Sequence, residues 1–160
     1  MSWFNIIVEQ ITIFLSLPEY ALPVLFLWCM ASATVLPLSS EVMVLSYVNV
    51  NPDKVNLTLV LATLGNTLGG MINYYVAFTA QKMAANTKLV TQSPNMLRWL
   101  EKAGAKMLFF SFIPIIGDPL TLLAGWLKLP WLPCLLWQFA GKLTRYAAIL
   151  ILAQYVKKWF

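Results

Sequence analysis

The chain has 160 residues, of which 60% are hydrophobic and 11% are charged, and its net charge is +5. Soluble domains are about 25% charged and about 45–50% apolar, and a chain of this length has too small an interior to bury so much apolar surface. The composition therefore excludes a disordered chain, a disulfide scaffold and an ordinary cytosolic enzyme, and it predicts an integral membrane protein.

Residue types that build most catalytic and metal sites are scarce. The chain contains no histidine, which removes His-dependent nucleophiles and zinc sites. Cys29 and Cys134 are isolated in apolar runs and are expected to be buried thiols. No glycine-rich nucleotide motif occurs. We therefore expect no enzyme activity, no cofactor, no metal and no nucleic-acid partner, and we attribute the positive charge to contact with anionic lipid headgroups.

The N-terminal segment, residues 1–20, is predicted to be an interfacial amphipathic helix. Asn5 and Glu9 interrupt its apolar run over 4–17, which is shorter than the 20 or so residues that a membrane span needs. Pro18 ends this run.

The next apolar stretch, residues 21–50, is predicted to be a re-entrant helical hairpin. Its only charge is Glu41, and its centre reads Pro-Leu-Ser-Ser-Glu. This is a poor helix interior, because proline removes a hydrogen bond and serine competes for backbone groups. A turn at membrane depth requires cover from protein or a water-filled cavity. We assign the turn to Pro37, Ser39 and Ser40.

Residues 55–81 carry no charge and are predicted to be a spanning helix, which completes a first repeat over 21–81. Small residues at a spacing of four let another helix approach closely, and two asparagines share a face with one of them. The packing residues are Gly65, Gly69 and Gly70, and Asn66 and Asn73 are assigned to a polar path.

Residues 82–106 are basic and are predicted to form an amphipathic connector on the membrane surface. Ser93 and Pro94 are typical of a helix N-cap and first helical residue.

A second repeat is predicted over 107–160. Its hairpin contains the run Pro-Ile-Ile-Gly-Asp-Pro, which we expect to interrupt the helix, and closes at Lys128–Pro130. The spanning helix follows over 131–155. The expected turn residues are Pro114, Gly117 and Pro119, and the expected packing residues are Gly125 and Gly141.

The two hairpins match at an offset of 77 residues, which pairs Pro37 with Pro114 and Glu41 with Asp118. Because one crossing separates them, the second hairpin enters from the opposite face, as in transporters with inverted repeats. The alternative is a chance match in an apolar chain. The predicted fold is a single all-α integral membrane domain, 1–160, with two inverted re-entrant helical hairpins, each followed by a transmembrane helix, plus amphipathic surface helices.

Four charges fall at membrane depth, where each costs about 2.5–3.5 kcal/mol on the insertion scale. Glu41 and Asp118 are candidate protonatable gates, and Lys142 and Arg145 are candidate contacts for an anionic headgroup, since both bind phosphate. Gln138 shares a helix face with the two bases. The alternative is that the acids and bases only form structural ion pairs.

Four stretches in order carry a family resemblance: SATVLPLSSE from Ser32, GNTLGGMINY from Gly65, GDPLTLLAGW from Gly117 and GKLTRY from Gly141. Over about residues 30–148 the chain resembles the DedA family, also called the VTT or SNARE-associated Golgi domain, and its short YqaA-like branch. Larger members carry an arginine on each side of a Phe-Ile-Pro element, where this chain has Ser111 and Gly117.

The resemblance implies a bacterial inner-membrane protein that moves lipids, such as undecaprenyl phosphate or phosphatidylethanolamine, with proton coupling. We therefore expect a small flippase or scramblase for phosphate-bearing lipids. Two alternatives remain open: a proton-linked carrier of a small solute or cation, and an assembly factor that transports nothing. The positive-inside rule puts residues 82–106 in the cytoplasm, whereas the resemblance puts both termini there.

Overall fold

The structure, a computed structural model, describes residues 20–34, 39–83 and 102–159. All regular elements in these ranges are helical, which confirms the all-α class. Residues 1–19 of the expected interfacial helix, the predicted turn residue Pro37 and residues 84–101 of the expected connector lie outside the described residues. The elements are α2 (Ala21–Ser32), α3 (Ser40–Val50), the 3₁₀ helix η1 (Pro52–Lys54), α4 (Val55–Met83), the 3₁₀ helix η2 (Gly104–Phe112), α6 (Pro114–Trp126) and α7 (Trp131–Trp159).

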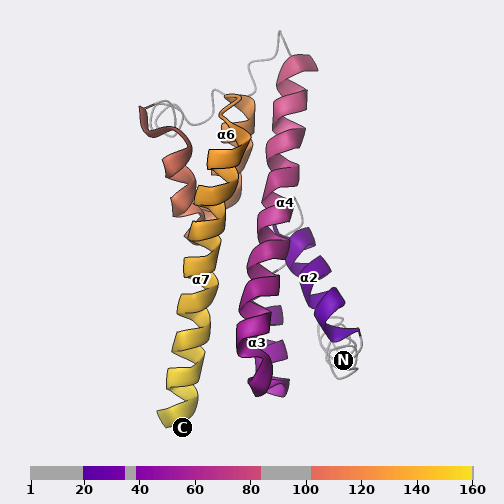
Figure 1. The fold of residues 1–160 in the computed structure, drawn as a ribbon, viewed down its shortest axis with the longest axis vertical. Coiled ribbons are helices and arrows are strands. Elements are labelled where there is room, and N and C mark those ends of the chain that lie inside the picture. Colours follow the sequence, from indigo (N-terminus) through magenta and orange to yellow (C-terminus); the bar gives the residue numbers. More distant parts are fainter. Residues whose placement is uncertain (1–19, 35–38, 84–101, 160) are drawn as a thin grey trace, which may run out of the picture.

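Two long helices, α4 and α7, run side by side through the length of the molecule (Figure 1). Each has 29 residues, which makes it about 43 Å long at 1.5 Å per residue. Among the described residues, Pro52–Gln81 is the one helical stretch that is both long and apolar enough to cross a membrane. α7 has the length but is more polar, because it carries Gln138, Lys142 and Arg145.

The four shorter helices form two pairs that approach mid-height from opposite ends (Figure 1). α2 rises from the lower end and α3 returns to it, whereas η2 descends from the upper end and α6 returns there. These helices have 9 to 13 residues, too few for a span of about 20 residues. Each pair packs against both long helices.

Of the turn residues predicted for the first pair and described in the structure, Ser39 precedes α3, whereas Ser40 is its first helical residue. α2 ends at Ser32, whose hydroxyl donates to the carbonyl of Cys29, and α3 begins at Ser40. Ser39 is the N-cap of α3, where its hydroxyl accepts from the backbone N–H of Val42 at 3.4 Å. This bond satisfies one of the donors that a helix start leaves open.

The second pair differs from the prediction, because the run from Pro114 to Pro119 is continuous helix. The bend lies one residue earlier, at Ile113, whose backbone is extended. Pro114 is the first helical residue, where no N–H is needed, and Pro119 in the next turn removes a single backbone bond. Gly117 lies inside α6, where a Cβ would be 2.9 Å from the carbonyl oxygen of Ser111.

Glycines bring the helices into close contact in a repeated pattern. A Cβ on Gly65 of α4 would lie 2.5 Å from the carbonyl oxygen of Phe26 in α2. Gly141 of α7, 76 residues after Gly65, contacts the carbonyl of Phe109 in η2 in the same way. Each long helix therefore contacts the first helix of one short-helix pair closely at a glycine. The other packing glycines also lie at contacts: Gly69 against Met30 and Ala33, Gly70 against Gln138 and Lys142, and Gly125 against Tyr74.

Each short-helix pair has its own hydrophobic core. One core joins α2 and α3 to α4 and α7 and contains Cys29 and Tyr47. The other joins η2 and α6 to the same long helices and contains Leu108 and Cys134. Both cysteines are buried free thiols, as expected.

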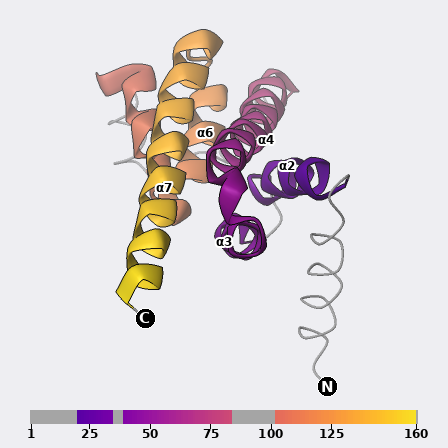
Figure 2. The same cartoon turned by 60° about the horizontal axis from the view of Figure 1, so that its bottom comes forward.

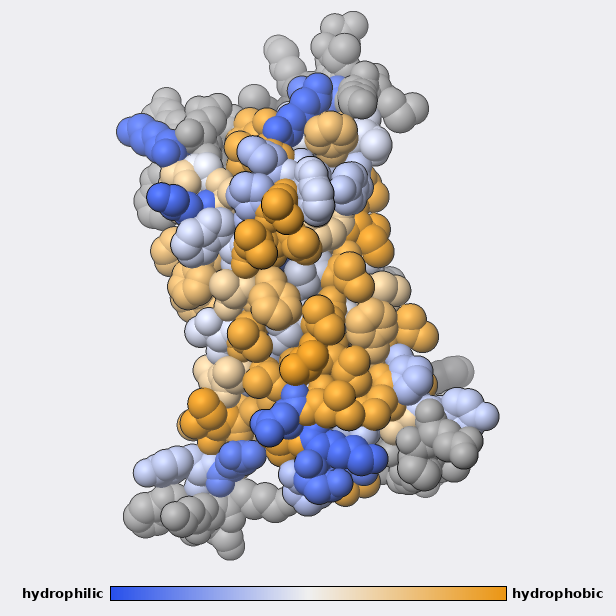
Figure 3. All heavy atoms as spheres, in the orientation of Figure 1, coloured by the Kyte–Doolittle hydropathy of each residue, from blue (hydrophilic) through white to orange (hydrophobic). Residues whose placement is uncertain are grey.

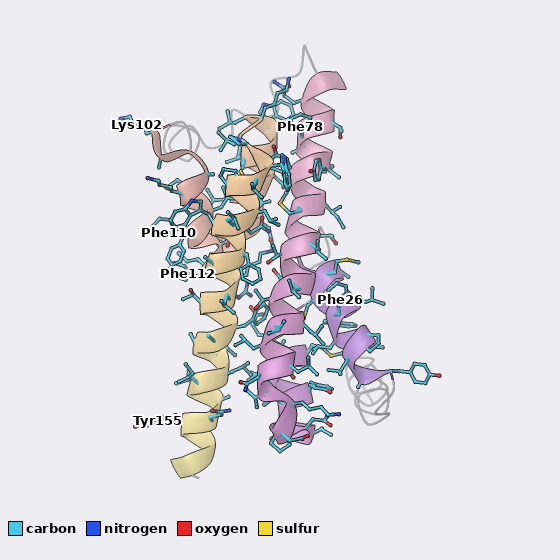
Figure 4. All side chains as sticks on the ribbon, in the orientation of Figure 1. Phe26, Phe78, Lys102, Phe110, Phe112 and Tyr155 are labelled. Atoms are coloured by element: carbon cyan, nitrogen blue, oxygen red, sulfur yellow. The ribbon has the colours of Figure 1, made fainter. Side chains whose placement is uncertain are left out.

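The exterior is apolar over most of its height. Figure 3 shows a broad hydrophobic band on one face, with hydrophilic residues gathered at the two ends. Phe110 of η2 and Tyr155 of α7, both labelled in Figure 4, are exposed on the outside of the bundle. This distribution suits an all-α integral membrane protein.

Candidate functional site

Two polar residues of α7, Gln138 and Lys142, lie inside the bundle near the middle of the helix. Gln138 and Lys142 are 0% and 1% exposed, and they point toward α4. Space for them comes from Gly70 of α4, where a Cβ would collide with the amide of Gln138 and lie 2.9 Å from Lys142 Nζ. A glycine on one helix thus admits two polar side chains from the other.

Lys142 has fewer hydrogen bonds than its chemistry allows. Its ammonium donates to the backbone carbonyl of Asn66 at 2.5 Å, although an ammonium has three N–H groups. Half-buried Asp118 of α6 interacts with it electrostatically, but within the described part of the chain the two do not form an ion pair. A buried charge with so few partners is costly, which marks this position as a candidate site.

Two further polar groups beside Lys142 lack a protein partner. Gln138 Nε2 donates to the carbonyl of Thr67 at 3.5 Å, but Gln138 Oε1 accepts no bond in the described structure. The buried hydroxyl of Thr67 is likewise unpaired. Since buried polar groups are nearly always satisfied, the interior between α4 and α7 has capacity to hold a polar group that the helices do not supply.

Arg145 forms an ion pair with Glu41, which joins the middle of α7 to the first turn of α3. Their side chains are 14% and 25% exposed. Ser39 donates to Glu41 Oε2 at 3.0 Å. The hydroxyl of Tyr146, the residue after Arg145, donates to Oγ of Ser40, the residue before Glu41, at 2.9 Å. The start of α3 is therefore fastened to α7 by two adjacent polar contacts.

The asparagines of α4 do not line a path with these charges. Asn73 Nδ2 donates to the carbonyl of Ala33 at 2.7 Å, and Asn66 Nδ2 donates to Ser32 Oγ at 3.4 Å. Both amides hold the C-terminal end of α2. Only the backbone carbonyl of Asn66 reaches the charged interior, through Lys142.

The candidate path residues thus divide into separate groups. Glu41 lies with Arg145, Asp118 and Gln138 lie near Lys142, and the two asparagine side chains hold α2. Sequence reasoning missed three buried hydroxyls that complete these groups. They are Thr67 and Tyr146, which directly follow Asn66 and Arg145, and Ser111, which donates to the carbonyl of Gln138 at 3.2 Å.

Comparison with known proteins gives consistent matches. The VTT domain family matches residues 36–155. The chain is 34% identical over 127 residues to the inner membrane protein YqaA of Escherichia coli (strain K12), covering 78% of this chain and 85% of that protein. An uncharacterized protein of Haemophilus influenzae is 34% identical over 137 residues, covering 81% of this chain and 85% of the relative. No solved structure matches.

Proposed function

The chain belongs to the VTT-domain family, the DedA family, and from this premise we propose that it moves phosphate-bearing lipids across the bilayer as a flippase or scramblase. It is a membrane protein, and its named relatives are inner membrane proteins of bacteria, so the expected location in the bacterial inner membrane is confirmed. Its VTT region covers α3, η2, α6, the whole of α4 and most of α7, and α2 precedes it.

In this proposal the two short-helix pairs are re-entrant hairpins. Their opposite directions and their common level at mid-height support this assignment (Figure 1). Their ends bend away from helical geometry at Ser39 and Ile113, and such backbone at membrane depth is tolerated only under protein cover. Inverted hairpins that meet at a polar centre are a common transporter architecture.

The observation that carries the proposal is the pair of bases on α7, Lys142 and Arg145, held inside the bundle beside the helix starts of α3 and α6. An arginine binds phosphate by two parallel hydrogen bonds, and a lysine binds it as a point charge. Arg145 remains partly exposed, whereas Lys142 is sealed. Arg145 is therefore the first headgroup contact, and Lys142 becomes available when the interior opens.

Proton coupling is expected because Arg145 is paired with a carboxylate, Glu41, when no headgroup is bound. A phosphate that replaces Glu41 on Arg145 leaves a carboxylate without its counter-ion. Uptake of a proton by Glu41 removes that unpaired charge, so headgroup entry and protonation favour each other.

The test is lipid movement in liposomes that contain purified protein and a trace of fluorescent phospholipid, with a membrane-impermeant reductant added outside. With the wild-type protein, fluorescent lipid from the inner leaflet should reach the outer leaflet, where the reductant bleaches it. Arg145→Ala should fall to the level of protein-free liposomes, and Glu41→Gln, which mimics the protonated carboxyl, should move lipid at a rate that no longer depends on pH. Lys106→Ala, which removes an exposed lysine of η2, should behave as wild type. If the wild-type protein is folded and the reductant still bleaches only the lipid of the outer leaflet, the proposal is refuted.

A second candidate function, a proton-linked carrier of a small solute, is favoured by the unpaired polar groups beside Lys142. Asp118 faces the same interior, without an ion pair among the described residues. A carrier of this kind needs its acids but not its bases. Proton flux that is lost in Asp118→Asn but persists in Arg145→Ala would support the carrier over lipid movement.

A further inference from the structure

An elongated groove of about 680 Å³ opens between α3 and the C-terminal half of α7, near the lower end of the molecule. Figure 2, which brings this end forward, shows the two helices beside each other. The volume lies within the range of about 300–1,000 Å³ that is common for ligand sites. The lining is mainly apolar and includes Leu45, Val48 and Asn49 of α3 and Ile149, Leu152 and Ala153 of α7.

The ion pair of Glu41 and Arg145 lies one helical turn beyond the lining of this groove on each helix. Leu45 lies one helical turn after Glu41 on α3, and Ile149 lies one turn after Arg145 on α7, so each pair of residues shares a helix face. The apolar groove therefore lies one helical turn from a partly exposed arginine and its acidic partner.

The corresponding place in the second repeat is closed. At the offset of 77 residues, Val48 of α3 corresponds to Gly125 of α6. Gly125 packs directly on the backbone carbonyl of Tyr74, so α6 lies tightly against α4. Val48 has a branched side chain in place of a hydrogen and lines the groove. One of the two corresponding helix contacts is therefore tightly packed and the other is open, and the open contact lies one helical turn from Arg145.

We infer that this groove is a lateral portal, which binds the hydrocarbon chain of an anionic lipid and brings its headgroup to Arg145. An apolar lining suits a hydrocarbon chain, and the single base one helical turn beyond it suits a negative headgroup. The inference rests on the proposed function, since the lipid held in the groove is the one to be moved. Opening of the Glu41–Arg145 pair then admits the headgroup to the interior.

Photo-crosslinking tests the occupant independently of transport. Benzoylphenylalanine replaces Leu152 in the groove or, as a matched control, Leu136, an exposed leucine of α7 outside the groove. Vesicles contain equal amounts of phosphatidylglycerol and phosphatidylcholine. At position 152, phosphatidylglycerol adducts should exceed phosphatidylcholine adducts about fivefold, the ratio for roughly 1 kcal/mol per basic residue. At position 136, adducts should follow the vesicle composition.

Two further variants test whether the charges and the groove cause the preference for phosphatidylglycerol. Glu41→Gln combined with Arg145→Gln removes both charges together and should abolish the preference at position 152. Val48→Trp fills the groove and should remove the adducts at position 152 while those at position 136 persist. Circular dichroism and gel filtration in detergent verify folding.

Adducts at position 152 that follow the vesicle composition would overturn the inference, as would crosslinked dimers in place of lipid adducts, which would assign the groove to a second copy of the chain. A clear lipid preference without inner-leaflet bleaching would instead refute lipid movement and leave the groove as a lipid-binding site.

Discussion

Arg145 and Glu41 form an ion pair that joins the middle of α7 to the first turn of α3. Asp118, which lies 77 residues after Glu41, has no such partner among the described residues and interacts with Lys142 only electrostatically, without an ion pair. The two acids therefore differ: Glu41 joins two helices through an ion pair, and Asp118 does not.

The ion pair makes the effects of its two partners on stability interdependent. Glu41→Gln alone leaves Arg145 without its counter-ion and should lower the free energy of unfolding by about 1–3 kcal/mol, below the range for fully buried pairs because both side chains are partly exposed. The double variant Glu41→Gln/Arg145→Gln should lose less than the sum of the single variants. Thermal unfolding in detergent measures this coupling, and additive losses would contradict it.

Lys142 should matter for transport more than for folding. Lys142→Met keeps the length of the side chain, removes a fully buried charge and gives up a bond to the Asn66 carbonyl. Because replacement of a buried charge by an apolar residue is often neutral or stabilising, the melting temperature should not fall, while lipid movement should be lost. The same substitution at exposed Lys106 is the control. A large fall in melting temperature would identify Lys142 as a structural residue.

The glycine contact between α6 and α4 should tolerate no added volume. Gly125→Ala places a Cβ against the backbone carbonyl of Tyr74, which cannot move independently of α4, and should cost about 1–3 kcal/mol as overpacking does. Leu68→Phe adds volume at an exposed position of α4 and should have little effect. Equal thermal stability of the two variants would show that α6 moves away from α4 at low cost.

Asn73 should act as an anchor for α2. Asn73→Ala leaves the carbonyl of Ala33 without its buried donor, at a cost of about 1–3 kcal/mol. Hydrogen exchange should rise in α2 before it rises in α7, because the lost bond holds only the end of α2. Faster exchange in both helices together would mean that Asn73 supports the whole bundle.

Much of the helix organisation could be predicted from sequence. Absence of charge over 55–81 identifies α4, and Ser39 and Ser40 mark the start of α3. The same local reasoning failed at Pro114–Pro119, where two prolines and a glycine suggested a break. A proline at the first helical position costs no hydrogen bond, so the bend could shift to Ile113 and the helix could continue.

Composition and local pattern were enough to predict the membrane class, the long helices, the glycines that permit close approach and the presence of four charges within apolar stretches. These follow from composition and from spacing along one helix. Three features became visible only in the folded chain: Glu41 pairs with Arg145, Asn73 holds the end of α2, and the α3–α7 contact is open while α6 packs tightly on α4. Those outcomes depend on distances between residues far apart in the chain, which are set by how the helices pack and not by any local pattern.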